Sequence, residues 1–151
     1  MSDSPVMVKR ATADDLVLVQ QAIAEINLPA SHGAGPLDDR ALRAFLSQPA
    51  HYVLLAVAGQ KVLGCLYGNA LWQPYRASPQ LFLYSIDVRP EYSGQGVGTA
   101  LVRCFIAEAR RAGACEVWVI TNRQNRAAMT MYTRCGLRPQ ADDDVVLTLA
   151  L

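Results

Sequence analysis

The chain has little that would mark it as a membrane, secreted or nucleic-acid-binding protein. No apolar run in its 151 residues approaches the roughly 18 to 20 that a membrane-spanning helix needs. The N-terminal segment MSDSPVMVKRAT lacks the basic start and apolar run of a signal peptide. The formal net charge is only +1, and no basic stripe with interleaved aromatic residues occurs. We therefore expect a cytoplasmic protein that binds neither membranes nor nucleic acid.

The cysteines are too far apart to indicate a metal site or a disulfide framework. Cys65, Cys104, Cys115 and Cys135 form no C-x-x-C pair, so we expect small core residues and no metal. The length fits one domain with its own hydrophobic core. We expect residues 1–151 to form that single domain.

Apolar periodicity and breaker residues predict the secondary structure. Strands are predicted at 6–11, 52–58, 61–71, 81–88, 115–121 and 145–151, and helices at 12–27, 38–47, 96–112 and 125–135. The early strands are joined as antiparallel neighbours, whereas strand 81–88, its crossover helix and strand 115–121 form a parallel βαβ unit. The fold class is therefore α/β of a mixed α+β kind. It has a central, mostly antiparallel sheet with helices on both faces.

A glycine-rich turn, SGQGVGT at 93–99, follows a predicted strand and opens a predicted helix. Small residues let backbone N–H groups approach a phosphate, and the helix N-terminus adds about half a positive charge. Neither the dinucleotide fingerprint G-x-G-x-x-G nor a Walker loop fits the sequence. The turn predicts an anion site, although a turn that only connects strand to helix would have a similar composition.

A second motif lies downstream, where Asn125, Ala128 and Tyr132 share one face of a predicted helix that Gly136 ends. Together the two motifs resemble the acetyl-CoA signature of the GNAT superfamily of N-acetyltransferases. That signature is Arg/Gln-x-x-Gly-x-Gly/Ala after a strand, followed by Asn-x-x-Ala-x-x-x-Tyr-x-x-x-Gly-Phe. Ser93 replaces the first Arg or Gln, and Leu137 replaces the Phe. The resemblance implies a GNAT-like fold over almost the whole chain, with acetyl-CoA as co-substrate.

Within the superfamily, the stretch 52–101 looks most like the aminoglycoside 3-N-acetyltransferases. The resemblance rests on the aromatic-proline loop WQPY at 72–75 and on LYSIDV at 83–88. That subgroup carries Asp where this chain has Ser85, so the contact of that acid with the substrate amine cannot be carried over. An aminoglycoside is therefore one candidate acceptor.

The resemblance implies a set of residues that bind acetyl-CoA: Val88, Gly94, Gln95, Gly96, Gly98, Thr99, Asn125 and Tyr132. If strands 81–88 and 115–121 splay apart, the backbone N–H of Val88 can face the thioester carbonyl as an oxyanion donor. A free phenol has a pKa of about 10 and a free thiol of about 8.5, so we expect Tyr132 to be protonated and to pass its proton to the leaving thiolate. A core tyrosine is the alternative, but the flanking Asn125 and Gly136 favour the catalytic role.

Ser85 and Asp87 are two residues apart on one strand and therefore face the same side, so both are predicted to contact the substrate. Asp87 is the candidate catalytic base, or else an acid paired with an arginine; both readings stay open. The acidic run 142–144 is typical of a solvated turn. Its members Asp143 and Asp144 are nevertheless candidate substrate-binding residues, because acids attract a cationic amine.

The predicted function is transfer of an acetyl group from acetyl-CoA to a primary amine of a small, cationic acceptor. The amine attacks directly in a ternary complex. Alternatives are a protein or peptide acceptor, reached at an N-terminus or a lysine, and an acyl-CoA sensor without turnover. The sensor is suggested by Ser85 and Ser93, which stand where the family has charged residues. Segment 145–151 could pair across a homodimer as an edge strand.

Overall fold

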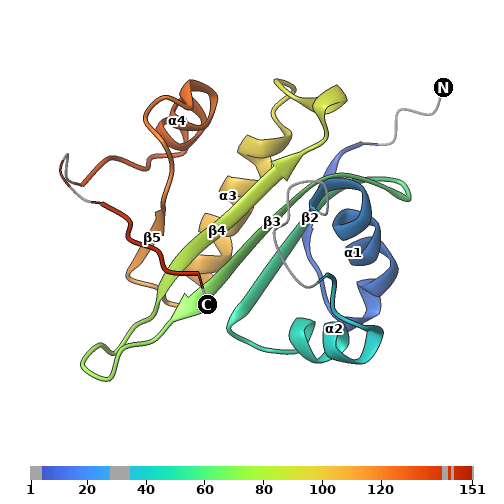
Figure 1. Ribbon diagram of the computed structural model, residues 1–151, viewed down its shortest axis with the longest axis horizontal. Helices are drawn as coiled ribbons and strands as arrows, with labels where there is room; N and C mark the ends of the chain where they lie inside the picture. The colour runs from blue at the N-terminus through green and yellow to red at the C-terminus, as the bar shows by residue number, and fades with distance from the viewer. Residues whose placement is uncertain (1–4, 28–34, 141–142, 144, 151) are drawn as a thin grey trace.

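Figure 1 shows the computed structural model, which describes residues 5–27, 35–140, 143 and 145–150. One five-stranded sheet runs through it in the order β1-β2-β3-β4-β5. The strands are β1 Met7–Arg10, β2 His51–Ala58, β3 Lys61–Leu71, β4 Gln80–Val88 and β5 Glu116–Val119. The first four strands pair antiparallel, and β4 pairs parallel with β5. The predicted mixed sheet with its parallel βαβ unit is confirmed.

The helices lie on both faces of the sheet, with α1 and α2 on one side and α3 on the other (Figure 1). They are α1 Leu16–Ala22, α2 Asp39–Leu46, α3 Val97–Arg111 and α4 Arg126–Arg134. Around α1, the predicted helix 12–27 begins as the 3-10 turn η1 Ala13–Asp15 and ends as the π-helical η2 Ile23–Asn27. A short 3-10 turn, η4 Pro90–Tyr92, follows β4. The helices in the part of the chain described here are too short or too polar to cross a bilayer.

Side chains explain where these helices begin. Thr12 and Asp15 form a capping box at the start of η1. The Asp38 carboxylate accepts the Ala41 N–H at 2.8 Å, and the Asn125 side-chain oxygen accepts the Ala128 N–H at 3.1 Å. Each acceptor satisfies a helix N–H that has no partner within the helix. Asp38 and Asn125 therefore cap α2 and α4, and the Thr12–Asp15 box caps η1.

Two hydrophobic clusters hold the helices to the sheet. Cluster one joins the sheet to α3 and α4 and includes Leu66, Leu83 and Phe105, whereas cluster two joins the other face to α1 and α2. Phe105 is fully buried, and a Cβ at Gly68 would lie 2.5 Å from its Cζ atom. Only glycine at position 68 lets the phenyl ring pack this closely on the sheet.

A β-bulge changes which side chains of β4 face which side of the sheet. Gly68 pairs with Leu83 but Tyr67 pairs with Ser85, so Tyr84 is the extra residue in β4. Before the bulge, Leu83 packs into cluster one; after it, Ile86 does so instead. Because side chains alternate along a strand, the bulge puts the side chains of Ser85 and Asp87 on the face away from α3.

The predicted closing strand at 145–151 is wrong for residues 145–150, which have no strand structure. Val145 and Leu147 are 77% and 89% exposed. A strand needs a neighbouring edge within hydrogen-bonding distance, and β5 offers only four residues. The Gln140 side chain, not the backbone, reaches β5, donating to Glu116 Oε1 at 2.6 Å. A groove of about 1410 Å³ is lined by β5, α4 and the residues around Val145.

Candidate active site

Strands β4 and β5 separate halfway along β4. Their parallel register runs from Gln80 opposite Glu116 to Leu83 opposite Val119. β5 ends there, whereas β4 continues to Val88 and stays paired with β3 on its other edge. The two strands therefore form a V that opens along residues 84–88 of β4, as the sequence interpretation required.

The hydrogen-bond register turns the backbone of Val88 into this opening. The Arg89 N–H donates to Leu63 O at 2.9 Å. In an antiparallel ladder, hydrogen-bonded and non-hydrogen-bonded pairs alternate, so the neighbouring pair of Val88 and Gly64 is of the second kind. The Val88 N–H consequently points away from β3, toward the side that β5 has left.

The glycine turn lies between η4 and α3. Gly94 and Gly96 have φ angles of +74° and +84°, in the left-handed region that favours glycine. A Cβ at either position would meet nothing within 4 Å, so the space over the turn is open. Among the residues described, no side chain caps the N-terminus of α3 at Gly96. The first N–H groups of α3 are therefore available to a phosphate, as a pantetheine pyrophosphate requires.

Helix α4 packs directly against the start of α3. A Cβ at Gly98 would lie 2.8 Å from the Met131 sulfur, and the Cys135 sulfur lies 4.0 Å from Thr99 O. Gly98 is thus required for helix packing, whereas Gly94 and Gly96 shape the turn itself. Gln95 donates from Nε2 to Glu91 O at 2.9 Å and closes the turn onto η4. The predicted cofactor residues of the turn and of α4 therefore lie in neighbouring elements.

Tyr132 lies on α4, on the side that faces the sheet. Its side chain is buried at 7% exposure in cluster one and also lines the groove along β5. Burial raises the pKa of its phenol, and the negative charge of Asp87 raises it further. Both causes favour the neutral form, so Tyr132 carries its proton at neutral pH.

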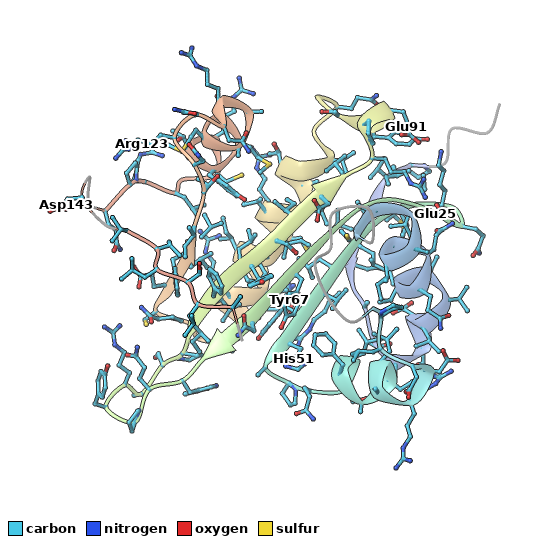
Figure 2. All side chains as sticks on the ribbon, in the orientation of Figure 1. Glu25, His51, Tyr67, Glu91, Arg123 and Asp143 are labelled. Carbon is cyan, nitrogen blue, oxygen red and sulfur yellow. The ribbon has the colours of Figure 1, made fainter. Side chains whose placement is uncertain are left out.

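The predicted substrate-binding residues lie in two different places. Ser85 and Asp87 share the face of β4 away from α3, opposite Tyr67 and Cys65 of β3. Asp143 is exposed and lies at the edge of the molecule on the side of Arg123, away from His51 and Tyr67 (Figure 2). Asp144 lies outside the described residues. Ser85 and Asp87 are therefore brought together, and Asp143 is not placed with Tyr67 on this face.

The face that carries Ser85 and Asp87 also carries a row of aromatic side chains, which the sequence interpretation missed. Each ring lies within 6 Å of the next one, in the order His51, Phe45, Tyr67, Tyr84, Phe82 and Trp118. We call these six residues the aromatic ladder. The alternation of Phe82 and Tyr84 with buried leucines in β4 was the available signal. Their meeting with rings from α2, β2, β3 and β5 is a product of the fold.

The family follows from a comparison with known proteins, because residues 20–137 match the acetyltransferase (GNAT) family. The chain belongs to this family, as its two motifs suggested.

Among curated proteins, N-acetyltransferase 8F1 of Rattus norvegicus is 31% identical over 84 residues, which cover 56% of this chain and 38% of that protein. The chain spans less than half the length of the curated relatives that head this comparison.

Solved structures show that the fold is shared with enzymes that act on different acceptors. An aminoglycoside acetyltransferase from an uncultured soil metagenomic sample, in complex with trehalose, superposes with a TM-score of 0.79 at 23% identity, over 97% of this chain and 95% of the other. A ribosomal-protein-alanine N-acetyltransferase from Brucella melitensis biovar Abortus 2308 gives 0.72 at 16% identity, over 95% and 100%. These identities establish the fold and leave the acceptor open.

Proposed function

We propose that this protein is an acetyl-CoA-dependent N-acetyltransferase that moves an acetyl group to a primary amine of a small acceptor by direct attack in a ternary complex. The observation that carries the proposal is the opening between β4 and β5, with the Val88 N–H directed into it and Tyr132 lining the groove along β5. Family membership and the uncapped start of α3 support it independently.

Each requirement of acetyl transfer has a residue in this arrangement. The first N–H groups of α3, over the turn with Gly94 and Gly96, would hold the pyrophosphate of acetyl-CoA. The Val88 N–H would stabilise the negative charge that develops on the thioester oxygen. Asn125, as the cap of α4, would fix the helix that carries Tyr132 and so position the phenol at the sulfur.

Tyr132 would donate its proton to the sulfur as the carbon–sulfur bond breaks. For free groups this transfer is uphill, because a phenol has a pKa of about 10 and a thiol has a pKa of about 8.5. The difference between them corresponds to about 2 kcal/mol of free energy. The raised pKa of Tyr132 increases that difference. We therefore expect the proton to move only as negative charge develops on sulfur. The proton that the nitrogen loses as the amide forms then restores the Tyr132 phenol and balances the reaction.

Asp87 is the proposed base for the proton that a cationic amine must lose before it can attack. It lies on the face of β4 away from α3, and its negative charge raises the pKa of Tyr132. An amine bound beside Ser85 would lie next to Asp87, which could accept the ammonium proton directly or through water. Asp143 and Asp144 remain proposed contacts for a cationic acceptor.

Several wider properties belong to the same proposal. Residues 1–151 would act as one N-acetyltransferase domain, in the cytoplasm and without a metal, on a small-molecule amine. A homodimer is proposed through the exposed apolar segment that begins at Val145. Light scattering of the purified chain at several concentrations would measure the oligomeric state directly.

The decisive experiment follows thiol release from acetyl-CoA with a panel of amines, for wild type beside Tyr132→Phe. The expected result is release that depends on one class of amine and a kcat that falls roughly 10²- to 10⁴-fold in the variant. Tyr52→Phe is the matched control, because Tyr52 is also buried in cluster one but packs on Phe105. Its kcat should stay near that of wild type.

Three results would contradict the proposal. Failure to bind acetyl-CoA would remove the cofactor assignment itself. Binding of acetyl-CoA without release of thiol by any amine, peptide or lysine would indicate an acyl-CoA sensor. Equal losses in Tyr132→Phe and Tyr52→Phe would show that Tyr132 is a core residue only.

A further inference from the structure

The aromatic ladder crosses the sheet on the face opposite α3. Phe82 and Trp118 stack with ring centroids 4.3 Å apart, and Tyr84 lies 5.9 Å from Phe82 and 5.8 Å from Tyr67. On the far side, Phe45 lies 5.5 Å from Tyr67 and 4.1 Å from His51. The rings come from α2 and from four strands, so the whole width of this face between α2 and β5 is aromatic.

The centre of the ladder is accessible and continuous with the proposed site. Tyr84, the extra residue of the β-bulge, is 67% exposed, and Tyr67 is half-buried. Tyr67 lies directly opposite Ser85 in the β3–β4 register. Figure 2 shows Tyr67 and His51 together at the α2 side of this face, their rings 6.4 Å apart. A molecule whose amine lies beside Ser85 and Asp87 would therefore rest its body on Tyr67 and Tyr84.

The sheet brings two acids to this face. Asp87 lies on β4, two residues from Ser85, and Glu116 lies on β5, two residues from Trp118 and opposite Gln80. Gln80 and Gln140 donate to the Glu116 carboxylate, and these neutral amides leave its negative charge in place. Asp87 shares its strand and its face with Ser85, so we expect the amine of a molecule that rests on Tyr67 and Tyr84 to approach Asp87.

We propose that the acceptor is a small amine that carries an aromatic ring, and that the ladder binds this ring while the amine reaches Asp87. This inference rests on the proposed function and specifies its substrate class. An aromatic ring gains from offset or edge-on contact with Tyr67 and Tyr84, and a cationic amine gains from their ring faces. The ladder accordingly sets which amines are used, while Val88 and Tyr132 carry out the transfer.

The test compares kcat/KM for four amines: 2-phenylethylamine, n-butylamine, spermidine and kanamycin. Phenylethylamine and butylamine each carry one primary amine, and only the first has a ring. We expect 2-phenylethylamine to exceed butylamine roughly tenfold or more, mainly through KM, and to exceed both polycations. Calorimetric titration of 2-phenylethylamine into the protein saturated with CoA provides a reading of binding that does not depend on turnover.

Variants of Tyr84 assign the effect to the ladder. Tyr84→Leu should raise the KM for 2-phenylethylamine roughly tenfold and leave that for butylamine nearly unchanged, whereas Tyr84→Phe, which keeps the ring, should restore the wild-type value. Tyr75→Leu is the matched control, since Tyr75 is similarly exposed but lies in the β3–β4 loop outside the ladder. Thermal unfolding of each variant checks that the fold is intact.

The outcomes separate this inference from the proposed function. Turnover of butylamine, spermidine or kanamycin with no preference for the aromatic amine overturns the inference and leaves the acetyltransferase intact. So does an equal response of Tyr84→Leu and Tyr75→Leu. Absence of acetyl-CoA binding, or of turnover with every amine, overturns the proposed function and the inference together.

Discussion

The two halves of the sheet differ in what covers them. Strands β1, β2 and β3 are antiparallel, and β2 and β3 bury side chains on both faces, in cluster one and in cluster two. β4 and β5 are parallel over only four pairs, and their second face carries the partly exposed ladder in place of a helix core. One half is built for stability, and the other leaves backbone and side chains for a ligand.

The difference shows that stability and chemistry draw on separate parts of one sheet. In β2, Leu54 and Leu55 are fully buried on opposite faces, so this strand contributes to both cluster one and cluster two. In the second half of β4, the bulge at Tyr84 and the loss of β5 free the Val88 N–H and the face of Asp87. Substitutions in the two halves should therefore affect different measurements.

The largest expected contrast compares two phenylalanines. Phe105→Ala should lower the free energy of unfolding by about 3–5 kcal/mol, because it empties a fully buried site against Gly68. Phe82→Ala should cost less than half of that, since Phe82 is only partly buried, but it should raise the KM of an aromatic acceptor. Urea unfolding and steady-state kinetics measure both quantities. Equal losses of stability in the two variants would show that the aromatic ladder is a hydrophobic core like cluster one.

A second contrast compares two glycines that are required for different reasons. Gly68→Ala should destabilise the protein by about 1–3 kcal/mol, because its Cβ would overlap Phe105 and approach Phe82 O at 2.7 Å. Gly94→Ala has open space around it but a positive φ, which costs an alanine about 1–2 kcal/mol. Only Gly94→Ala should also raise the KM for acetyl-CoA. Acetyl-CoA kinetics unchanged in Gly94→Ala would argue against the turn as the pyrophosphate site.

The smallest effect tests the link between β4 and α4 through the pH dependence of kcat. Asp87→Asn removes a negative charge that raises the pKa of Tyr132, while burial, the larger cause, remains. The pKa of Tyr132 should fall, so the alkaline limb of kcat should move to lower pH. If Asp87 is also the base, kcat falls and the acid limb is lost. An alkaline limb that stays in place would show that the two groups do not interact.

Thermal unfolding of the same variants checks the direction of this effect. A folded pKa above the unfolded value of about 10 gives a contribution to stability that is present below pH 10 and disappears as the pH rises through the folded pKa. Asp87→Asn lowers the folded pKa of Tyr132 and should therefore make this alkaline loss of stability smaller. Asp14→Asn, at an exposed position of η1, is the control and should match wild type in both measurements.

Local patterns were sufficient to predict most elements and both GNAT motifs. The caps at Asp38 and Asn125, the hairpin from β2 to β3 and the glycine turn all depend on residues close together in the chain. The strand predicted at 145–151 is absent at residues 145–150, because an apolar pattern does not specify which sheet edge would pair with it. Strand formation depends on a partner, and a partner is a property of the fold.

The sequence by itself determined the family, the order of strands and helices, and the residue types offered to acetyl-CoA, because each is encoded in short spacings. Tertiary structure decided where those groups point. The bulge at Tyr84 placed Ser85 and Asp87 on the face away from α3. The hydrogen-bond register between β3 and β4 turned the Val88 N–H into the opening. Packing assembled six aromatic rings from four strands and a helix. Such features depend on pairings between distant segments, which no local pattern specifies.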